Sequence, residues 1–179
     1  MTVATLVTLS RLVLVAPIVF LIRNNIHQNL AMALFCVAAA TDYFDGAIAR
    51  RFSQETSLGA QLDAAVDKIF IYSILLILSL HGAYSWSLVA MAFSRDAIVE
   101  ALRCLSARRN RVLPANRWGK LKFVFQCISV AAVLVSRSLG MQIEYTFANG
   151  FLALAIILSL PGLVIVAQSA IRREVSETV

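Results

Sequence analysis

The fold is decided by two short stretches that place acidic residues within apolar sequence, Asp42-Tyr-Phe-Asp45-Gly46-Ala-Ile-Ala49-Arg50 and Gly59-Ala-Gln-Leu-Asp63-Ala-Ala-Val-Asp67. Asp42 and Asp45 are three positions apart, and Asp63 and Asp67 are four positions apart. On a helix, either spacing puts both side chains on one face. If the two helices are antiparallel neighbours, the four carboxylates converge on one pocket.

The surrounding sequence is too apolar for a soluble domain of this length. Hydrophobic residues make up 60% of the 179 residues and charged residues 15%, whereas a soluble protein is nearer half apolar and about a quarter charged. A helix needs roughly 20 mostly apolar residues to cross a membrane. Six such stretches occur, at about 5–22, 27–49, 60–81, 84–105, 118–138 and 146–169. We predict an all-α integral membrane protein with six transmembrane helices, forming one domain over residues 1–179.

The basic residues indicate how these helices cross the membrane. Arg50 and Arg51 follow the second stretch, seven cations lie around the connection between the fourth and fifth, and Arg172 and Arg173 follow the sixth. The connection at His81 has no Lys or Arg. Six spans with both termini inside would place these basic clusters in the cytoplasm and leave one Arg in each of the first and fifth connections, Arg23 and Arg137. Short basic loops beside spans favour anionic lipids as partners, so no nucleic acid partner is expected.

The ends of the predicted spans support the same topology. The first stretch holds Arg11 and lacks a preceding basic segment, so we expect it to stay in the membrane and not to be cleaved as a signal peptide. Tyr84, Trp86 and Trp118 fall near span ends, where aromatic side chains anchor helices at the interface.

Four carboxylates near the ends of apolar helices need a physical reason. A charged side chain within a span costs at least ~2.5 kcal/mol on insertion scales. Four like charges at close range cannot all stay ionised unless cations join them. Hard divalent cations such as Mg²⁺ or Mn²⁺ suit carboxylate and phosphate oxygens, and paired metals recur in phosphate displacement. Gly46 and Gly59 leave room beside the carboxylates, and Arg50 can hold a phosphate by two parallel hydrogen bonds.

Two other interpretations of the carboxylates were weighed. One Asp pair alone could be a structural hydrogen-bonded pair, but four Asp with two Gly and an Arg are not explained in that way. An ion-coupled transporter also buries carboxylates. However, these Asp lie near the cytoplasmic ends of the predicted spans, away from the midplane, and no matching half-repeat is visible.

The complete pattern resembles the signature of the CDP-alcohol phosphotransferase family, D-x2-D-G-x2-A-R-x8-G-x3-D-x3-D. All eight fixed positions match, with every gap in register. The resemblance implies six transmembrane helices, usually in a homodimer, with an active site open to the cytoplasm. Such enzymes join an alcohol to the phosphate of a CDP-linked donor and release CMP.

The resemblance also implies a role for each motif position. Asp42, Asp45 and Asp63 would be ligands of two divalent cations, Mg²⁺ or Mn²⁺. Asp67 would complete the metal site and act as the general base on the acceptor hydroxyl. The remaining positions, with one more residue from the same loop, would bind the CDP donor: Gly46, Ala49, Arg50, Thr56 and Gly59.

Other segments bear on the acceptor alcohol. Residues 5–17, 94–103 and 118–126 resemble the bacterial members of this family that make phosphatidylglycerophosphate. The resemblance implies a bacterial inner membrane, with CDP-diacylglycerol as donor and sn-glycerol 3-phosphate as acceptor. Ala64, Asp96 and Phe123 depart from that pattern, which usually has Pro, Glu and Thr there. Inositol phosphate, serine and phosphatidylglycerol therefore stay open as acceptors.

A dianionic acceptor requires fixed cations. The candidates are Arg95, Arg103, Lys120 and Lys122, with Arg103 and Lys120 as first choices. For the two Lys the alternative is an ordinary basic loop. For the two Arg it is snorkelling to the interface, or pairing with Asp96 or Glu100.

Overall fold

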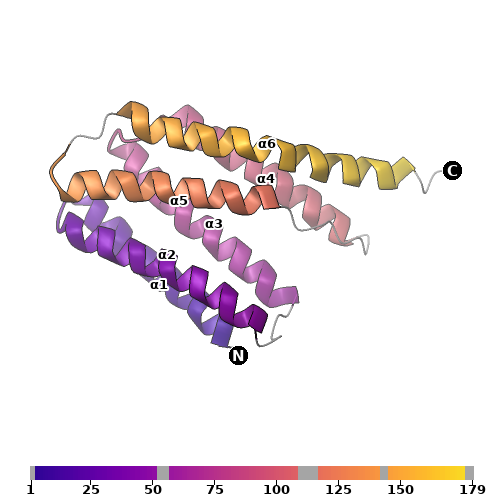
Figure 1. Ribbon diagram of the computed structural model, residues 1–179, viewed down its shortest axis with the longest axis horizontal. Coiled ribbons are helices and arrows are strands. Elements are labelled where there is room, and N and C mark those ends of the chain that lie inside the picture. Colours follow the sequence, from indigo (N-terminus) through magenta and orange to yellow (C-terminus); the bar gives the residue numbers. More distant parts are fainter. Residues whose placement is uncertain (1–2, 52–56, 109–116, 142–144, 176–179) are drawn as a thin grey trace.

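A computed structural model describes the backbone of residues 3–51, 57–108, 117–141 and 145–175, and the side chains within 10–41, 65–106, 118–141 and 146–168. The described residues form six helices and no strand, which confirms the all-α prediction (Figure 1). The helices are α1 (Val3–Arg23), α2 (Gln28–Arg51), α3 (Ser57–Leu80), α4 (Trp86–Arg108), α5 (Arg117–Ser138) and α6 (Tyr145–Val175). Each begins and ends within a few residues of its predicted stretch, except that α6 continues further.

Three helices end at a residue with left-handed backbone geometry. These residues are Asn25 after α1 (φ 54°), Gly82 after α3 (φ 75°) and Gly140 after α5 (φ 66°). In each case the amide of the next residue donates a hydrogen bond to a carbonyl oxygen in the last turn of the helix. The Ala83 amide, for example, lies 3.0 Å from the Leu78 carbonyl oxygen. Gly and Asn favour this cap because other side chains adopt a positive φ at a cost. The three caps reverse the chain at one end of the bundle, which we call the distal end (left in Figure 1).

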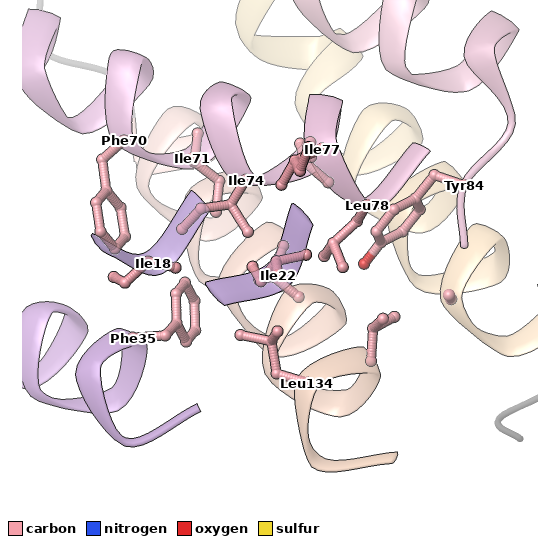
Figure 2. Close-up of a cluster of buried hydrophobic side chains, with 14 of the residues drawn as sticks. Ile18, Ile22, Phe35, Phe70, Ile71, Ile74, Ile77, Leu78, Tyr84 and Leu134 are labelled. Atoms are coloured by element: carbon pink, nitrogen blue, oxygen red, sulfur yellow. The ribbon is translucent and has the colours of Figure 1, made fainter. Parts of the chain in front are cut away.

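Helix α1 packs against both α2 and α3, while α5 packs against α6 and α2, and α4 packs against α6. Buried apolar side chains from all six helices form one core, among them Ile18, Ile22, Phe35, Ile74 and Leu134 (Figure 2). The rings of Phe35 and Phe70 stack with centroids 5.7 Å apart. In lipid, such contacts stabilise through close packing, because the lipid chains are as apolar as the side chains.

A hydrogen-bonded chain ties the α3–α4 connection to α5 and α6. The hydroxyl groups of Tyr84 and Ser129 lie 2.7 Å apart, and the Ser129 hydroxyl donates to the Ala148 carbonyl oxygen at 3.0 Å. Tyr84 is only 1% exposed, so its predicted role as an interface anchor is wrong. Trp86 and Trp118 are more exposed, as such anchors would be.

Within the described residues, two segments are long and apolar enough to cross a membrane, Trp118–Ser138 of α5 and Thr146–Gln168 of α6. Large apolar side chains also face outward on other helices, including Phe20, Leu76 and Phe93. An outward apolar surface is what a helix bundle presents to lipid chains. The membrane prediction is therefore supported, while the count of six spans stays a prediction.

Candidate active site

The two halves of the aspartate motif lie at the end of the bundle opposite the three caps, here called the motif end. Asp42, Asp45, Gly46, Ala49 and Arg50 belong to the last turns of α2, and Gly59, Asp63 and Asp67 belong to the first half of α3. Thr56 lies outside the described residues, as do the side chains of 42–64. Among the described side chains, no group of three potential metal ligands gathers. The predicted convergence of four carboxylates thus stays a prediction, and Asp67 is the member of the set with a described side chain.

Asp67 is held by an arginine from α1. Arg11, which is 2% exposed, donates from Nη1 to Oδ1 of Asp67 in an ion pair. The Asp67 side chain is 21% exposed, so it lies at the edge of the packed bundle. A buried guanidinium both offsets the negative charge of the carboxylate and restricts its rotamer. Sequence reasoning gave Arg11 no role in the site, although a charge inside the first apolar stretch was the signal for one.

A second polar cluster lies deeper in the bundle and centres on Asp96 of α4. Oδ2 of Asp96 accepts hydrogen bonds from Nζ of Lys122 and, at 2.7 Å, from the Tyr72 hydroxyl. Oδ1 accepts from Nη1 of Arg95 at 2.9 Å, and Nη2 of Arg95 donates to the Ser159 carbonyl oxygen at 2.7 Å. These contacts join α3, α4, α5 and α6. We call Tyr72, Arg95, Asp96 and Lys122 the Asp96 cluster.

The Asp96 cluster carries more positive than negative charge. Arg95 and Lys122 are cations and share one carboxylate, so the cluster has a formal charge of +1 when Tyr72 is neutral. Lys122 is only 3% exposed, and its ammonium lies 5.7 Å from the centre of the Tyr72 ring. Gln126, one helical turn beyond Lys122, is 1% exposed, and its side chain lies beside the Tyr72 hydroxyl. A buried cluster with an excess of positive charge is a favourable setting for an anion.

The four predicted acceptor residues divide into two pairs. Lys122 and Arg95 both belong to the Asp96 cluster, and the alternative considered for Arg95, pairing with Asp96, is what the structure has. Lys120 is exposed and Arg103 is half-buried, and neither forms an ion pair with a described residue. Glu100, the alternative partner of Arg103, instead pairs with Lys68 of α3. The side chains of Tyr72, Asp96 and Gln126 were not among the predicted site residues.

The Asp96 cluster lies close to Asp67 along the chain of α3. Asp67 and Tyr72 are five residues apart, which corresponds to a rise of roughly 7 Å. Asp67 turns toward α1, whereas Lys68 and Tyr72 turn toward Glu100 and Asp96 of α4. Two polar contacts, Lys68 with Glu100 and Tyr72 with Asp96, therefore join α3 to α4 beside the motif.

Comparison with known proteins adds the final evidence. Residues 1–165 match the sequence profile of the CDP-alcohol phosphatidyltransferase family. The chain is 36% identical over 137 residues to the CDP-diacylglycerol–glycerol-3-phosphate 3-phosphatidyltransferase of Escherichia coli K12, covering 73% of this chain and 75% of that protein. It is 34% identical over 142 residues to a probable phosphatidylglycerophosphate synthase of Mycobacterium tuberculosis. That match covers 75% of this chain and 66% of the mycobacterial protein, just under two thirds of its length.

Proposed function

The chain belongs to the CDP-alcohol phosphatidyltransferase family, and we propose that it transfers the phosphatidyl group of CDP-diacylglycerol to sn-glycerol 3-phosphate. The products would be phosphatidylglycerophosphate and CMP. The observation that carries this proposal is the similarity to bacterial relatives named for that reaction over about three quarters of the chain. The intact eight-position motif supports the reaction type independently.

The carboxylates of the motif fit two divalent cations, Mg²⁺ or Mn²⁺. Asp42, Asp45, Asp63 and Asp67 offer only oxygen donors, which hard cations prefer. The partly exposed carboxylate of Asp67, at the edge of the bundle, is compatible with such a role. When bound, the cations would neutralise negative charge on the donor phosphates. Gly46, Ala49 and Gly59 would leave room for the cytidine nucleotide, and Arg50 with Thr56 would contact the donor.

Asp67 is proposed to accept the proton of the acceptor hydroxyl. As that proton leaves, the hydroxyl oxygen forms a bond to the donor phosphorus next to the diacylglycerol. The bond from that phosphorus to the bridging oxygen breaks, and CMP leaves with the electron pair. Arg11 would act as a positioning residue, since its ion pair fixes the Asp67 side chain. A base need only accept the proton as the new bond forms, so even a weakly basic carboxylate suffices.

The acceptor phosphate is proposed to bind on the α4–α5 side of the motif. The net positive charge of the Asp96 cluster supports this side, and Lys122 and Arg95 would supply that charge. Arg103 and Lys120 lie on the same two helices, nearer the motif end, and would contact the phosphate from there. Charge-assisted hydrogen bonds from several cations suit a dianion.

The protein is proposed to lie in a bacterial inner membrane with the motif end in the cytoplasm, as a homodimer. The soluble substrate, glycerol 3-phosphate, and the soluble product, CMP, are cytoplasmic, and most of the basic residues gather at the motif end. This distribution agrees with the tendency of cytoplasmic loops to be basic.

The purified protein in detergent micelles should release CMP from CDP-diacylglycerol only with Mg²⁺ or Mn²⁺ and an added alcohol. We expect glycerol 3-phosphate to give a lipid product and chelation of the metal to stop the reaction reversibly. Inositol phosphate, serine and phosphatidylglycerol, each supplied alone, should give little product. A lipid product from inositol phosphate and none from glycerol 3-phosphate would overturn the proposed acceptor. Metal-independent turnover would overturn the proposed metal site.

Replacing Lys120 or Arg103 with glutamine should raise the KM for glycerol 3-phosphate. A lost charge-assisted hydrogen bond is worth about 1.5–3 kcal/mol, so an increase of about tenfold or more is expected. The KM for CDP-diacylglycerol should change less than about twofold. Arg172→Gln removes the same charge from the far end of α6 and serves as the control. Equal changes in both KM values would argue that these side chains do not select the acceptor.

A further inference from the structure

The distal end of the bundle carries its own group of basic side chains, remote from the aspartate motif. Arg23 ends α1, His81 follows α3, and Arg137 lies in the last turn of α5. Nη2 of Arg137 donates to Oδ1 of Asn25, and the His81 side chain faces the backbone carbonyl of Arg23. We call Arg23, His81 and Arg137 the distal basic cluster.

Among the residues that the structure describes at this end, 22–30, 80–86 and 136–141, there is no Asp or Glu to offset this charge. Burial, and then the charge of Arg137, lower the pKa of His81, while the Arg23 carbonyl raises it. His81 is therefore mainly neutral near pH 7 and contributes a hydrogen-bond donor, whereas the two Arg contribute the charge. Two guanidinium groups and an imidazole are a suitable set of donors for a phosphate.

An apolar groove leads to the distal basic cluster. A cavity of about 350 Å³ lies between α1 and α3, lined by Leu12, Ala16 and Val19 from α1 and by Ser73, Leu76 and Leu80 from α3. Leu12 and Val19 are seven positions apart, which corresponds to a length of roughly 10 Å along the helix. Arg23 stands one turn beyond Val19, and His81 follows Leu80 directly. The groove thus ends beside the hydrogen-bond donors of the distal basic cluster.

We propose that the groove and the distal basic cluster together bind an anionic phospholipid of the membrane. One acyl chain would lie between α1 and α3, and the phosphate would contact Arg23, Arg137 and His81. The dimensions favour a single acyl chain over a packed helix, because two turns of a helix about 10 Å wide would fill more than twice the volume of the groove. The charge favours a lipid with a net negative headgroup over a zwitterionic one. This site is separate from the proposed transfer reaction, because the donor headgroup belongs at the opposite end.

The test measures lipid binding to the full-length protein without catalysis. Phosphatidylglycerol and phosphatidylcholine of matched chain length are titrated separately into the detergent-solubilised protein. The lipid molecules bound to each protein are then counted by native mass spectrometry. We expect phosphatidylglycerol to bind about tenfold more tightly. In Arg23→Gln/Arg137→Gln the difference should fall to about twofold or less, since each basic residue contributes a severalfold preference. Ala16→Phe fills the groove and should weaken binding of both lipids.

Matched variants keep the result interpretable. Asn25→Gly preserves the positive φ and removes the partner of Arg137, so the preference should persist. Arg137→Lys keeps the charge and should retain part of the preference even if the glutamine variant folds poorly. An unchanged preference in the double variant would overturn the proposal. So would displacement by inorganic phosphate, which would indicate a soluble anion, or displacement by CMP but not by inorganic phosphate, which would indicate the donor site.

Discussion

Replacing Asp67 with asparagine should abolish transfer while leaving donor binding intact. Asparagine has nearly the same shape and can still accept a hydrogen bond from Arg11, but it cannot take a proton from the acceptor hydroxyl. A positioned general base contributes about 10²–10⁴-fold to rate, so we expect turnover to fall by at least about a hundredfold. Product formation from glycerol 3-phosphate measures the loss, and binding of CDP-diacylglycerol measured separately should change little.

Two comparisons separate a lost base from a disturbed site. The variant should elute like the parent protein, because Asp67 lies at the edge of the bundle and is partly exposed, although loss of the counter-charge of the buried Arg11 lowers the free energy of unfolding. Arg11→Gln removes the positioning contact and keeps the carboxylate, so it should lower kcat less than Asp67→Asn does. Normal turnover in a folded Asp67→Asn protein would eliminate Asp67 as the base. A loss of donor binding equal to the loss of rate would assign it to the metal site alone.

Replacing Asp96 with asparagine should have the largest effect on stability. The carboxylate accepts hydrogen bonds from Tyr72, Arg95 and Lys122, and its loss leaves two cations without their counter-charge inside the bundle. Breaking a buried ion pair costs about 3–5 kcal/mol in soluble proteins. Single polar contacts between membrane helices average about 0.6 and reach about 1.7 kcal/mol, so three of them give a similar range. We expect a loss of about 2–5 kcal/mol in the free energy of unfolding, measured by denaturation in micelles.

The same substitution at an exposed pair provides the control. Glu100 pairs with Lys68 across the same two helices, but these side chains are 51% and 34% exposed. Exposed ion pairs contribute about 0–1 kcal/mol, so Glu100→Gln should have little effect. Asp96→Leu with Lys122→Met removes one charge of each sign and should be less destabilised than Asp96→Asn. If Glu100→Gln and Asp96→Asn lose equal stability, burial of the Asp96 charges is not the cause.

The helices could be predicted because the length of each apolar stretch is enough to indicate a helix there. Each predicted stretch corresponds to one helix, and the motif spacing assigned the chain to its family before any geometry was known. The Asp96 cluster could not be predicted, since it joins residues 24, 26 and 50 positions apart through tertiary packing. Arg11 could have been suspected as a charge in an apolar stretch, but its partner lies 56 positions away.

Tyr84 illustrates a different limit. An aromatic residue with a hydroxyl near the end of a span usually stays at the interface, and Trp86, two positions later, is half exposed as such a residue would be. Tyr84 is drawn inward because Ser129 and the Ala148 carbonyl form a chain of partners for its hydroxyl. Such partners come from α5 and α6, and nothing in the local sequence around Tyr84 identifies them.

The position of the charges in α4 also has a consequence for biogenesis. The ribosome delivers α4, with Arg95 and Asp96 near its middle, before it delivers α5 with Lys122. Each unpaired charge at the centre of a helix costs about 2.5–3.5 kcal/mol to insert from the translocon. Because Arg95 and Asp96 lie on the same helix, they offset part of this cost, but the remaining partners of Asp96 are on α3 and α5. If α4 spans the membrane as predicted, it would therefore settle fully in lipid only once α5 has followed it, and the two helices would enter the bilayer as one hairpin.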